Sequence, residues 1–388
     1  MPVINRVAEL ADEITAWRRH LHENPEILYE VHETAAFVAD KLRSFGVDEV
    51  VTGLGRTGVV GVIRGGKAGP GKTIALRADM DALPMDELTD LPYKSKRPGA
   101  MHACGHDGHT AMLLGAAKYL AETRNFSGTA VMIFQPAEEG GNGAEAMVKD
   151  GLMERFGVDE VYGLHNDPTL AIGQFGIRPG ALMAAMDKFT IEISGKGSHG
   201  AAPHLSIDPV FIASQLIGAL QSIASRNVDP LDSVVVSTCV VQAGSAFNII
   251  PQTAKLVGTV RTLNETTRDL AERRMTEICA GLAASFGATI DVDYWRGTPV
   301  LVNDEAKTAL AVSIASEVAG PDAVNAGVKP IMGGEDFAFM LNARPGAFIF
   351  LGNGDTPYCH HPAYDFSDEA IPFGVSYFAR LIETATRA

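Results

Sequence analysis

The sequence has few cysteines, a deficit of cations and no long apolar run, and each shortage excludes a class of protein. Four cysteines in 388 residues are too few and too dispersed for a disulfide scaffold, and a reducing compartment would keep them as thiols. The chain has 32 Lys and Arg residues and 47 Asp and Glu residues. The resulting net charge of −15 argues against a nucleic-acid partner. No stretch approaches the ~18 apolar residues of a membrane span, and the N-terminus lacks the apolar centre of a signal peptide. We therefore expect a soluble cytoplasmic protein with no nucleic-acid or membrane partner.

The composition is that of an ordinary globular protein. Hydrophobic residues make up 46% and charged residues 20% of the chain. A length of 388 residues is long for one domain and suits two domains of roughly 100 to 200 residues each. We find no internal repeat and no low-complexity segment.

The two ends of the chain have the pattern of one α/β domain. Residues 6–45 have helical spacing, interrupted at Asn24-Pro25, where a helix would break. Short apolar runs that end in polar residues then predict buried strands, with a helix over 109–123 between the first two. These runs are 73–81, 129–140, 158–166 and 347–355.

The middle of the chain has a different order of elements. It predicts strand 188–194, helix 208–225, strands 233–241 and 254–262, helix 265–286 and strand 288–295. This βαββαβ order is that of a ferredoxin-like unit. We predict an α/β domain of residues 1–183 and 297–388, with a central mixed sheet flanked by helices, and an inserted ferredoxin-like α+β satellite domain of residues 184–296.

The densest group of candidate metal ligands is the loop MHACGHDGH at 101–109. Cys104 and His106 are two residues apart, and glycines in the loop allow the tight backbone that two ligands of one ion require. A single Cys or His here would more often cap a helix. The cluster reverses that preference and favours a metal site.

Further candidates follow the other predicted strands, where α/β sheets usually build their sites. Glu138 and Glu139 follow one strand, so one carboxylate could bind metal while the other faces a bound water. Taken singly, such residues could equally form a solvated acidic turn or a loop histidine. The candidates at the remaining strand ends are His165, the pair His360-His361, and Asp79 with Asp81.

Ordered motifs along nearly the whole chain resemble the M20 metallopeptidases, in the amidohydrolase branch of hippurate hydrolases, N-acyl-amino-acid amidohydrolases and auxin-conjugate hydrolases. The motifs are RRHLHENPE (18–26), RADMDALP, HACGHDGHT, FQPAEEGGNGA, GLHNDP, GKGSHGAAPH (195–204), NIIPQTAKLVGTVR (248–261), GGEDFAFM (333–340) and HHPAYDF.

The resemblance implies a role for each matching residue. It implies two divalent ions per subunit, Zn²⁺ or Mn²⁺, held by Cys104 as a bridging ligand with His106, Glu139, His165 and His360. The wider family has a histidine ligand at the position of Asp79, which we do not expect Asp79 to replace. The other implied residues are Glu138 as general base, His199 as an oxyanion-stabilising residue that reaches a neighbouring subunit, Asp81 as a residue that orients a ligand, and Asn248, Arg261 and Gly334 as substrate contacts.

The activity that this resemblance implies is hydrolysis of the amide bond of a small N-acyl amino acid by a metal-activated water. The satellite domain would then act as a lid and carry a homodimer or dimer-based oligomer. A dipeptidase or aminoacylase would use the same mechanism. Two rivals remain, a hydrolase with Cys104 as nucleophile and a non-catalytic metal-binding relative. The second would have no use for Glu138.

Overall fold

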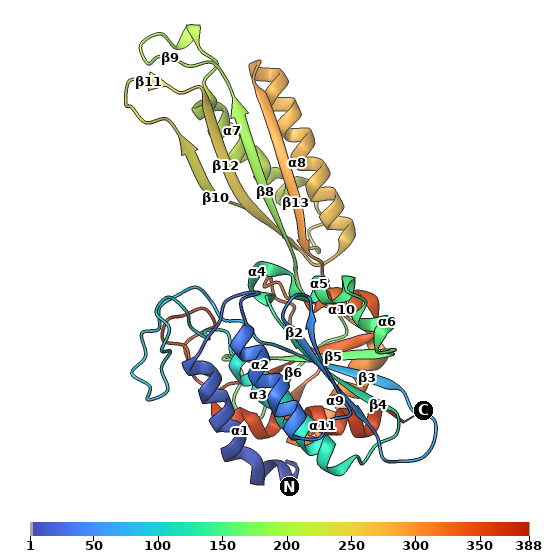
Figure 1. Ribbon diagram of the computed structural model, residues 1–388. Helices are drawn as coiled ribbons and strands as arrows, with labels where there is room; N and C mark the ends of the chain where they lie inside the picture. The colour runs from blue at the N-terminus through green and yellow to red at the C-terminus, as the bar shows by residue number, and fades with distance from the viewer. Residues whose placement is uncertain (1–2, 388) are drawn as a thin grey trace. The chain divides into compact units, whose positions relative to one another are not determined.

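The computed structural model describes residues 3–387, and their contacts divide them into two compact units. Unit 1 holds the described chain up to Gly180, Val302–Lys329 and the described chain from Asp336 on. Unit 2 holds Ala181–Leu301 together with Pro330–Glu335. Figure 1 shows the elements of both.

Unit 1 is built on one mixed sheet of eight strands. Its order is β1-β2-β4-β3-β5-β16-β6-β15. Strands β3, β4, β5 and β16 are mutually parallel where they pair, while β1, β2 and β4 pair antiparallel. The strands are β1 (Glu49–Leu54), β2 (Gly58–Arg64), β3 (Thr73–Asp79), β4 (Thr129–Gln135), β5 (Glu160–Asp167), β6 (Phe175–Gly176), β15 (Val324–Asn325) and β16 (Gly346–Gly352).

Helices cover this sheet and bury its central strands. Strand β16 is buried throughout, which explains why its sequence is a continuous apolar run and not an alternating one. Helix α3 packs against α1 and α11, and α5 packs against α10 (Figure 1). The helices are α1 (Asn5–Glu23), α2 (His32–Ser44), α3 (His106–Thr123), α4 (Glu138–Gly141), α5 (Gly143–Lys149), α6 (Leu152–Arg155), α9 (Glu305–Ala319), α10 (Ala338–Ala343) and α11 (Ile371–Ala385), with short 3-10 turns at Pro321–Ala323 and Asp368–Ala370.

Unit 2 has an antiparallel four-stranded sheet with two helices on one face (Figure 1). The sheet order is β10-β12-β8-β13, and the chain order is βαββαβ. Alternate residues of β8 and β12 are buried, as expected of a sheet with one covered face. The elements are β8 (Ala185–Ser194), α7 (Pro209–Ser222), β10 (Val234–Ala243), β12 (Thr253–Thr262), α8 (Glu265–Phe286) and β13 (Thr289–Thr298), with the short pieces β9 (Ser198–His199), Pro203–Leu205, a π-turn at Ile223–Asn227 and β11 (Ile249–Ile250).

Capping residues explain where the two helices of unit 2 begin and end. The Asn264 side chain accepts a 2.7 Å hydrogen bond from the backbone N–H of Thr267 and starts α8, and Gly287 ends that helix in the left-handed region at φ 68°. Asp208 caps α7 in the same way and is followed by Pro209, which suits the first helical position.

The predicted fold class is confirmed. A large mixed sheet flanked by helices is present, and the middle of the chain folds as the predicted βαββαβ unit. Short strands β7 (Gly180–Met183) and β14 (Leu301–Asn303) lie where the chain passes between units. Among the described residues, no helix combines the length and the apolarity that a membrane span requires.

Candidate metal centre

The predicted ligands of unit 1 lie at one edge of its sheet. Strands β3, β4, β5 and β16 run parallel, so the segments that follow them meet at the same edge. His165 lies near the end of β5, Glu138 and Glu139 follow β4, and His360 follows β16. The loop with Cys104 leads into α3 beside them.

Three groups made of these residues converge there, each with its donor atoms within 4.8 Å of one another, and a further group of Asp79, His106 and His109 adjoins them through His106. The first contains Cys104, His106 and His165. The second contains Cys104, Glu139 and His360, and the third contains His106 with Glu138 and Glu139. Cys104 belongs to two of these groups, which is the arrangement that a bridging ligand requires.

Unusual backbone conformations bring these donors together. Gly105 has φ 93°, and a Cβ atom there would lie 2.1 Å from Oδ1 of Asn166, so only glycine fits. Ala137 has φ 55° just before the Glu138-Glu139 pair, and His360 has φ 69°. Backbone strain of this kind concentrates at functional sites.

His360 and not His361 faces the other donors. Nε2 of His360 is 3.2 Å from Oε1 of Glu139. His361 instead uses Nδ1 to accept a hydrogen bond from the backbone N–H of Ala363.

Asp81 positions Glu138, Glu139 and His106 through hydrogen bonds. Its carboxylate accepts hydrogen bonds from the backbone N–H groups of Glu138 (3.0 Å) and Glu139 (3.2 Å). Its backbone carbonyl lies 2.8 Å from Nδ1 of His106. A carbonyl can only accept, so Nδ1–H of His106 donates to it, and the neutral ring that binds a metal then has its lone pair on Nε2.

One buried atom of this cluster, Nε2 of His106, has no hydrogen-bond partner among the described residues. Buried polar atoms are almost always paired. A cation bound between His106 and its neighbouring donors would satisfy this nitrogen.

Asp79 takes a different position from Asp81. It is fully buried, with Arg77 at 2.6 Å and Nδ1 of His109 at 2.7 Å. Nε2 of His109 lies 2.7 Å from Oδ1 of Asn166. Both ring nitrogens of His109 are therefore engaged by oxygen atoms, which leaves His109 supporting the cluster.

The electrostatics of the cluster favour positive charge. Burial alone would lower the pKa of His106, but the carboxylates of Asp79, Asp81 and Glu139 outweigh it and raise that pKa well above its usual range. Burial raises the pKa of Glu139, and its hydrogen bond with His360 reverses that and lowers the pKa. A cluster that stabilises imidazolium would also attract a divalent cation.

Cys104 has the opposite character to an activated nucleophile. Its contact with Cys359, followed by burial, raises the pKa of the Cys104 thiol well above its usual range. Reactive cysteines have a depressed pKa. Sγ of Cys104 is 3.3 Å from Nε2 of His165, and both residues belong to the first donor group.

The four remaining predicted residues belong to unit 2 and form two pairs. His199 on β9 is exposed, and its strand pairs with β11, next to Asn248. The backbone N–H of Gly200 donates a 2.7 Å hydrogen bond to the carbonyl of Asn248. Arg261 on β12 is half-buried, and a Cβ atom on Gly334 would lie 3.4 Å from its Nη1.

Sequence reasoning missed a buried ionic network behind the metal loop. Nε of Arg18 is 2.9 Å from Oδ2 of Asp107, and Nδ1 of His22 is 2.8 Å from the same oxygen. The arginine also reaches Asp365 at 2.7 Å. Its one signal in the sequence is the motif RRHLHENPE, which contains both Arg18 and His22.

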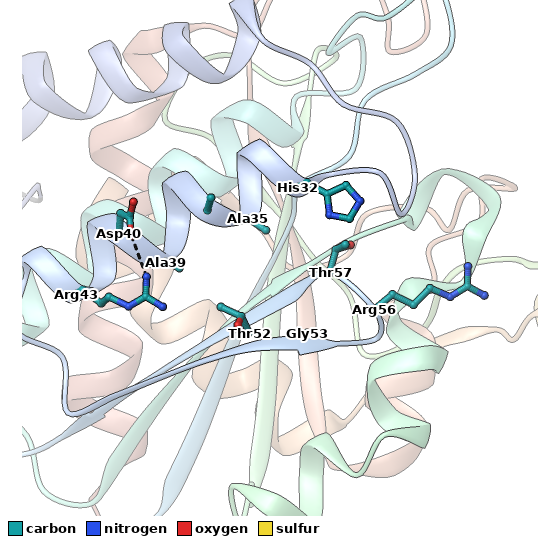
Figure 2. A pocket seen from close by; sticks show the side chains of 10 residues that line it. His32, Ala35, Ala39, Asp40, Arg43, Thr52, Gly53, Arg56 and Thr57 are labelled. Atoms are coloured by element: carbon teal, nitrogen blue, oxygen red, sulfur yellow. Dashed lines mark hydrogen bonds and ion pairs between the residues drawn. The ribbon is translucent and has the colours of Figure 1, made fainter.

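Two cavities of similar size lie elsewhere. One, of about 370 Å³, lies between α2 and β1, and Figure 2 shows His32, Arg43 and Arg56 around it, with none of the predicted site residues. The other, of about 330 Å³, lies in unit 2 and is lined by Met186, Trp295 and Arg261 among others.

A mixed-sheet α/β unit that gathers thiolate, imidazole and carboxylate donors at its strand ends defines a metal-dependent hydrolase. The sequence model of peptidase family M20/M25/M40 matches residues 75–384. The chain belongs to this family.

Relatives with similar sequences place the chain in the amidohydrolase branch of this family. The chain is 45% identical over 381 residues to a hippurate hydrolase of Campylobacter jejuni, covering 98% of both chains. It is 44% identical to an N-acetyl-L-cysteine deacetylase of Bacillus subtilis, covering 98% of this chain and 89% of that one. The crystal structure of a dinuclear metal-binding peptidase of family M20 from Bacillus subtilis superposes with a TM-score of 0.85 at 35% identity, covering 98% and 99% of the two chains.

Proposed function

We propose that the protein hydrolyses the amide bond of N-acyl amino acids with two divalent metal ions. The observation that carries the proposal is the convergence of three donor groups, in which Cys104 and His106 each belong to two, together with the buried and unpartnered Nε2 of His106. The proposed ligands are Cys104, His106, Glu139, His165 and His360. Thiolate and imidazole donors suit Zn²⁺, and the carboxylate also permits Mn²⁺.

The bound ions would supply a water of lowered pKa and positive charge near the developing oxyanion. Glu138 is placed to take the proton of that water on its carboxylate, because it lies with His106 and Glu139 and is partly exposed. It would then return the proton to the leaving amine nitrogen. Asp81 keeps Glu138 in position through the backbone hydrogen bond described above.

Residues of unit 2 would bind the substrate and its oxyanion. The imidazole of His199 is exposed and could donate a hydrogen bond to the oxyanion. The Arg261 guanidinium makes a hydrogen bond only to Thr259 among those the structure shows, so it can bind the amino-acid carboxylate, with Gly334 beside it. Asn248 is proposed as a further contact.

We also propose a homodimer or dimer-based oligomer formed through unit 2. Strand β10 is an edge strand, and Val240 and Val241 are 37% and 57% exposed on it. An exposed edge of this kind pairs readily with a second chain. Sedimentation of the purified protein tests this, and a monomer at all concentrations would contradict it.

A cytoplasmic location remains a proposal. The four cysteines are all free in the structure, including the exposed Cys239. Free thiols persist in a reducing compartment.

Reconstitution with a substrate panel tests the activity. The protein is stripped with a chelator and then supplied with Zn²⁺ or Mn²⁺ in the presence of hippurate, N-acetyl-L-cysteine, other N-acetyl amino acids or dipeptides, and the released amino acid is measured. We expect no turnover without metal and release of the free amino acid from N-acyl substrates with metal. Turnover that survives complete metal removal would contradict the proposal and favour the cysteine nucleophile.

A further inference from the structure

Two cysteines from distant parts of the chain meet beside the candidate metal centre. Cys104 lies in the loop before α3, and Cys359 lies in the segment after β16. The backbone N–H of His360 donates a 2.7 Å hydrogen bond to the carbonyl of Ala103. This hydrogen bond joins the residue before Cys104 to the residue after Cys359, so the two cysteines lie on neighbouring stretches of backbone.

The end of strand β5 holds both sulfur atoms. Sγ of Cys104 is 3.3 Å from Nε2 of His165. The side-chain amide of Asn166 donates to Sγ of Cys359 over 3.9 Å. Each sulfur therefore contacts one of two consecutive residues at the same end of β5.

The two thiols differ in access to solvent. Cys104 is only 8% exposed, while Cys359 is partly exposed. A small oxidant would therefore meet Cys359 first.

We propose that Cys104 and Cys359 form an intramolecular disulfide when the metal-free protein meets hydrogen peroxide. In the first step the sulfur of Cys359 attacks one peroxide oxygen. An S–O bond forms, the O–O bond breaks, and the products are a sulfenic acid and water. In the second step the sulfur of Cys104 attacks that sulfenic sulfur, the S–S bond forms, the S–O bond breaks, and hydroxide leaves with the thiol proton as water. Two thiols are oxidised and one peroxide is reduced to two waters.

The disulfide would take Cys104 out of the metal centre, because a disulfide sulfur lacks the thiolate charge that binds metal. This consequence rests on the proposed function. The cross-link itself does not, since it depends only on the position of the two sulfurs.

Thiol counting tests the cross-link without any activity measurement. The full-length protein is stripped with a chelator, treated with hydrogen peroxide, denatured and titrated with a thiol reagent. We expect the four thiols of the chain to fall to two. A peptide map without reductant should join Cys104 to Cys359, and reduction should restore all four thiols.

Two serine variants separate this cross-link from general oxidation. Cys239→Ser removes the exposed cysteine of unit 2, and this variant should still lose two thiols. Cys359→Ser should form no internal disulfide. If Cys359→Ser loses as many thiols as the unchanged chain, or if the map joins Cys239 of two chains instead, the proposal is wrong.

Metal uptake after oxidation separates this proposal from the proposed function. The oxidised chain should take up fewer than two Mn²⁺ ions, and peroxide-treated Cys359→Ser should take up two. A chain with the mapped cross-link that still binds two ions would contradict the ligand role of Cys104. Absence of the cross-link contradicts only the disulfide.

Discussion

Replacing Arg18 with methionine should destabilise unit 1 far more than replacing the neighbouring Arg19 with methionine. Arg18 is 0% exposed, and it lies 2.9 Å from Asp107 and 2.7 Å from Asp365. Removing one member of a buried ion pair costs about 3–5 kcal/mol, because the carboxylate that stays buried loses its partner. Methionine keeps much of the apolar stem, so the loss comes mainly from the charge.

Arg19→Met is the matched control. The Arg19 side chain is 46% exposed and lies 2.8 Å from Asp368, and an exposed pair of this kind contributes about 0–1 kcal/mol. Urea unfolding of the metal-free variants, followed by circular dichroism, gives the two changes in the free energy of unfolding. If Arg18→Met loses no more than Arg19→Met, the buried network has no structural role and the reasoning is refuted.

Three further changes test other contacts. Burial alone would lower the pKa of His22, but the charge and hydrogen bond of Asp107 raise it from 6.5 to about 9, so its stabilising effect is full below pH 6.5 and lost as the pH rises through 9. The melting-temperature advantage of the unchanged protein over His22→Gln should therefore shrink across that range, and an advantage that does not depend on pH would contradict the assignment. Asp81→Asn should lower metal affinity by about 10- to 100-fold, measured by competition with a chelator, because an amide cannot accept both backbone hydrogen bonds, and unchanged affinity would show that Asp81 does not position the ligands. Gly105→Ala should lower the melting temperature more than Gly46→Ala, since both have positive φ but only the first would clash, and equal losses would remove the steric argument.

Much of the fold could be predicted from the pattern of the sequence. The predicted helix 265–286 has the limits that α8 has in the structure, because Asn264 and Gly287 are strong start and stop signals. The buried strands are visible as short apolar runs that end in polar residues. The antiparallel pair β1 (Glu49–Leu54) and β2 (Gly58–Arg64) and the two-residue strands β6 and β15 were missed. The two-residue strands are defined by their partners and carry little periodicity of their own. Strand β2 is a seven-residue run, GVVGVIR, that is buried and apolar up to its final arginine, so the sequence did contain a signal for it.

The site could be predicted only as a set of residue types. His165 and Glu139 could be predicted as candidate ligands because they follow predicted strands, and parallel strands bring their carboxyl ends to one edge of the sheet. The contact of Cys359 with Cys104 and the network of Arg18 depend on tertiary packing over a long sequence separation. The sequence has no local signal for either contact, although Cys359 directly precedes His360.

Metal content and turnover of two neighbouring variants test the central claim most directly. Glu138→Gln and Glu139→Gln make the same chemical change at adjacent positions. Glu138→Gln should keep two ions per chain while its turnover of an N-acyl amino acid falls by about 10²- to 10⁴-fold, the usual contribution of a general base. Glu139→Gln should lose at least one ion. If Glu138→Gln retains full turnover, or if both variants keep two ions and the same activity, the assignment of base and ligand is contradicted.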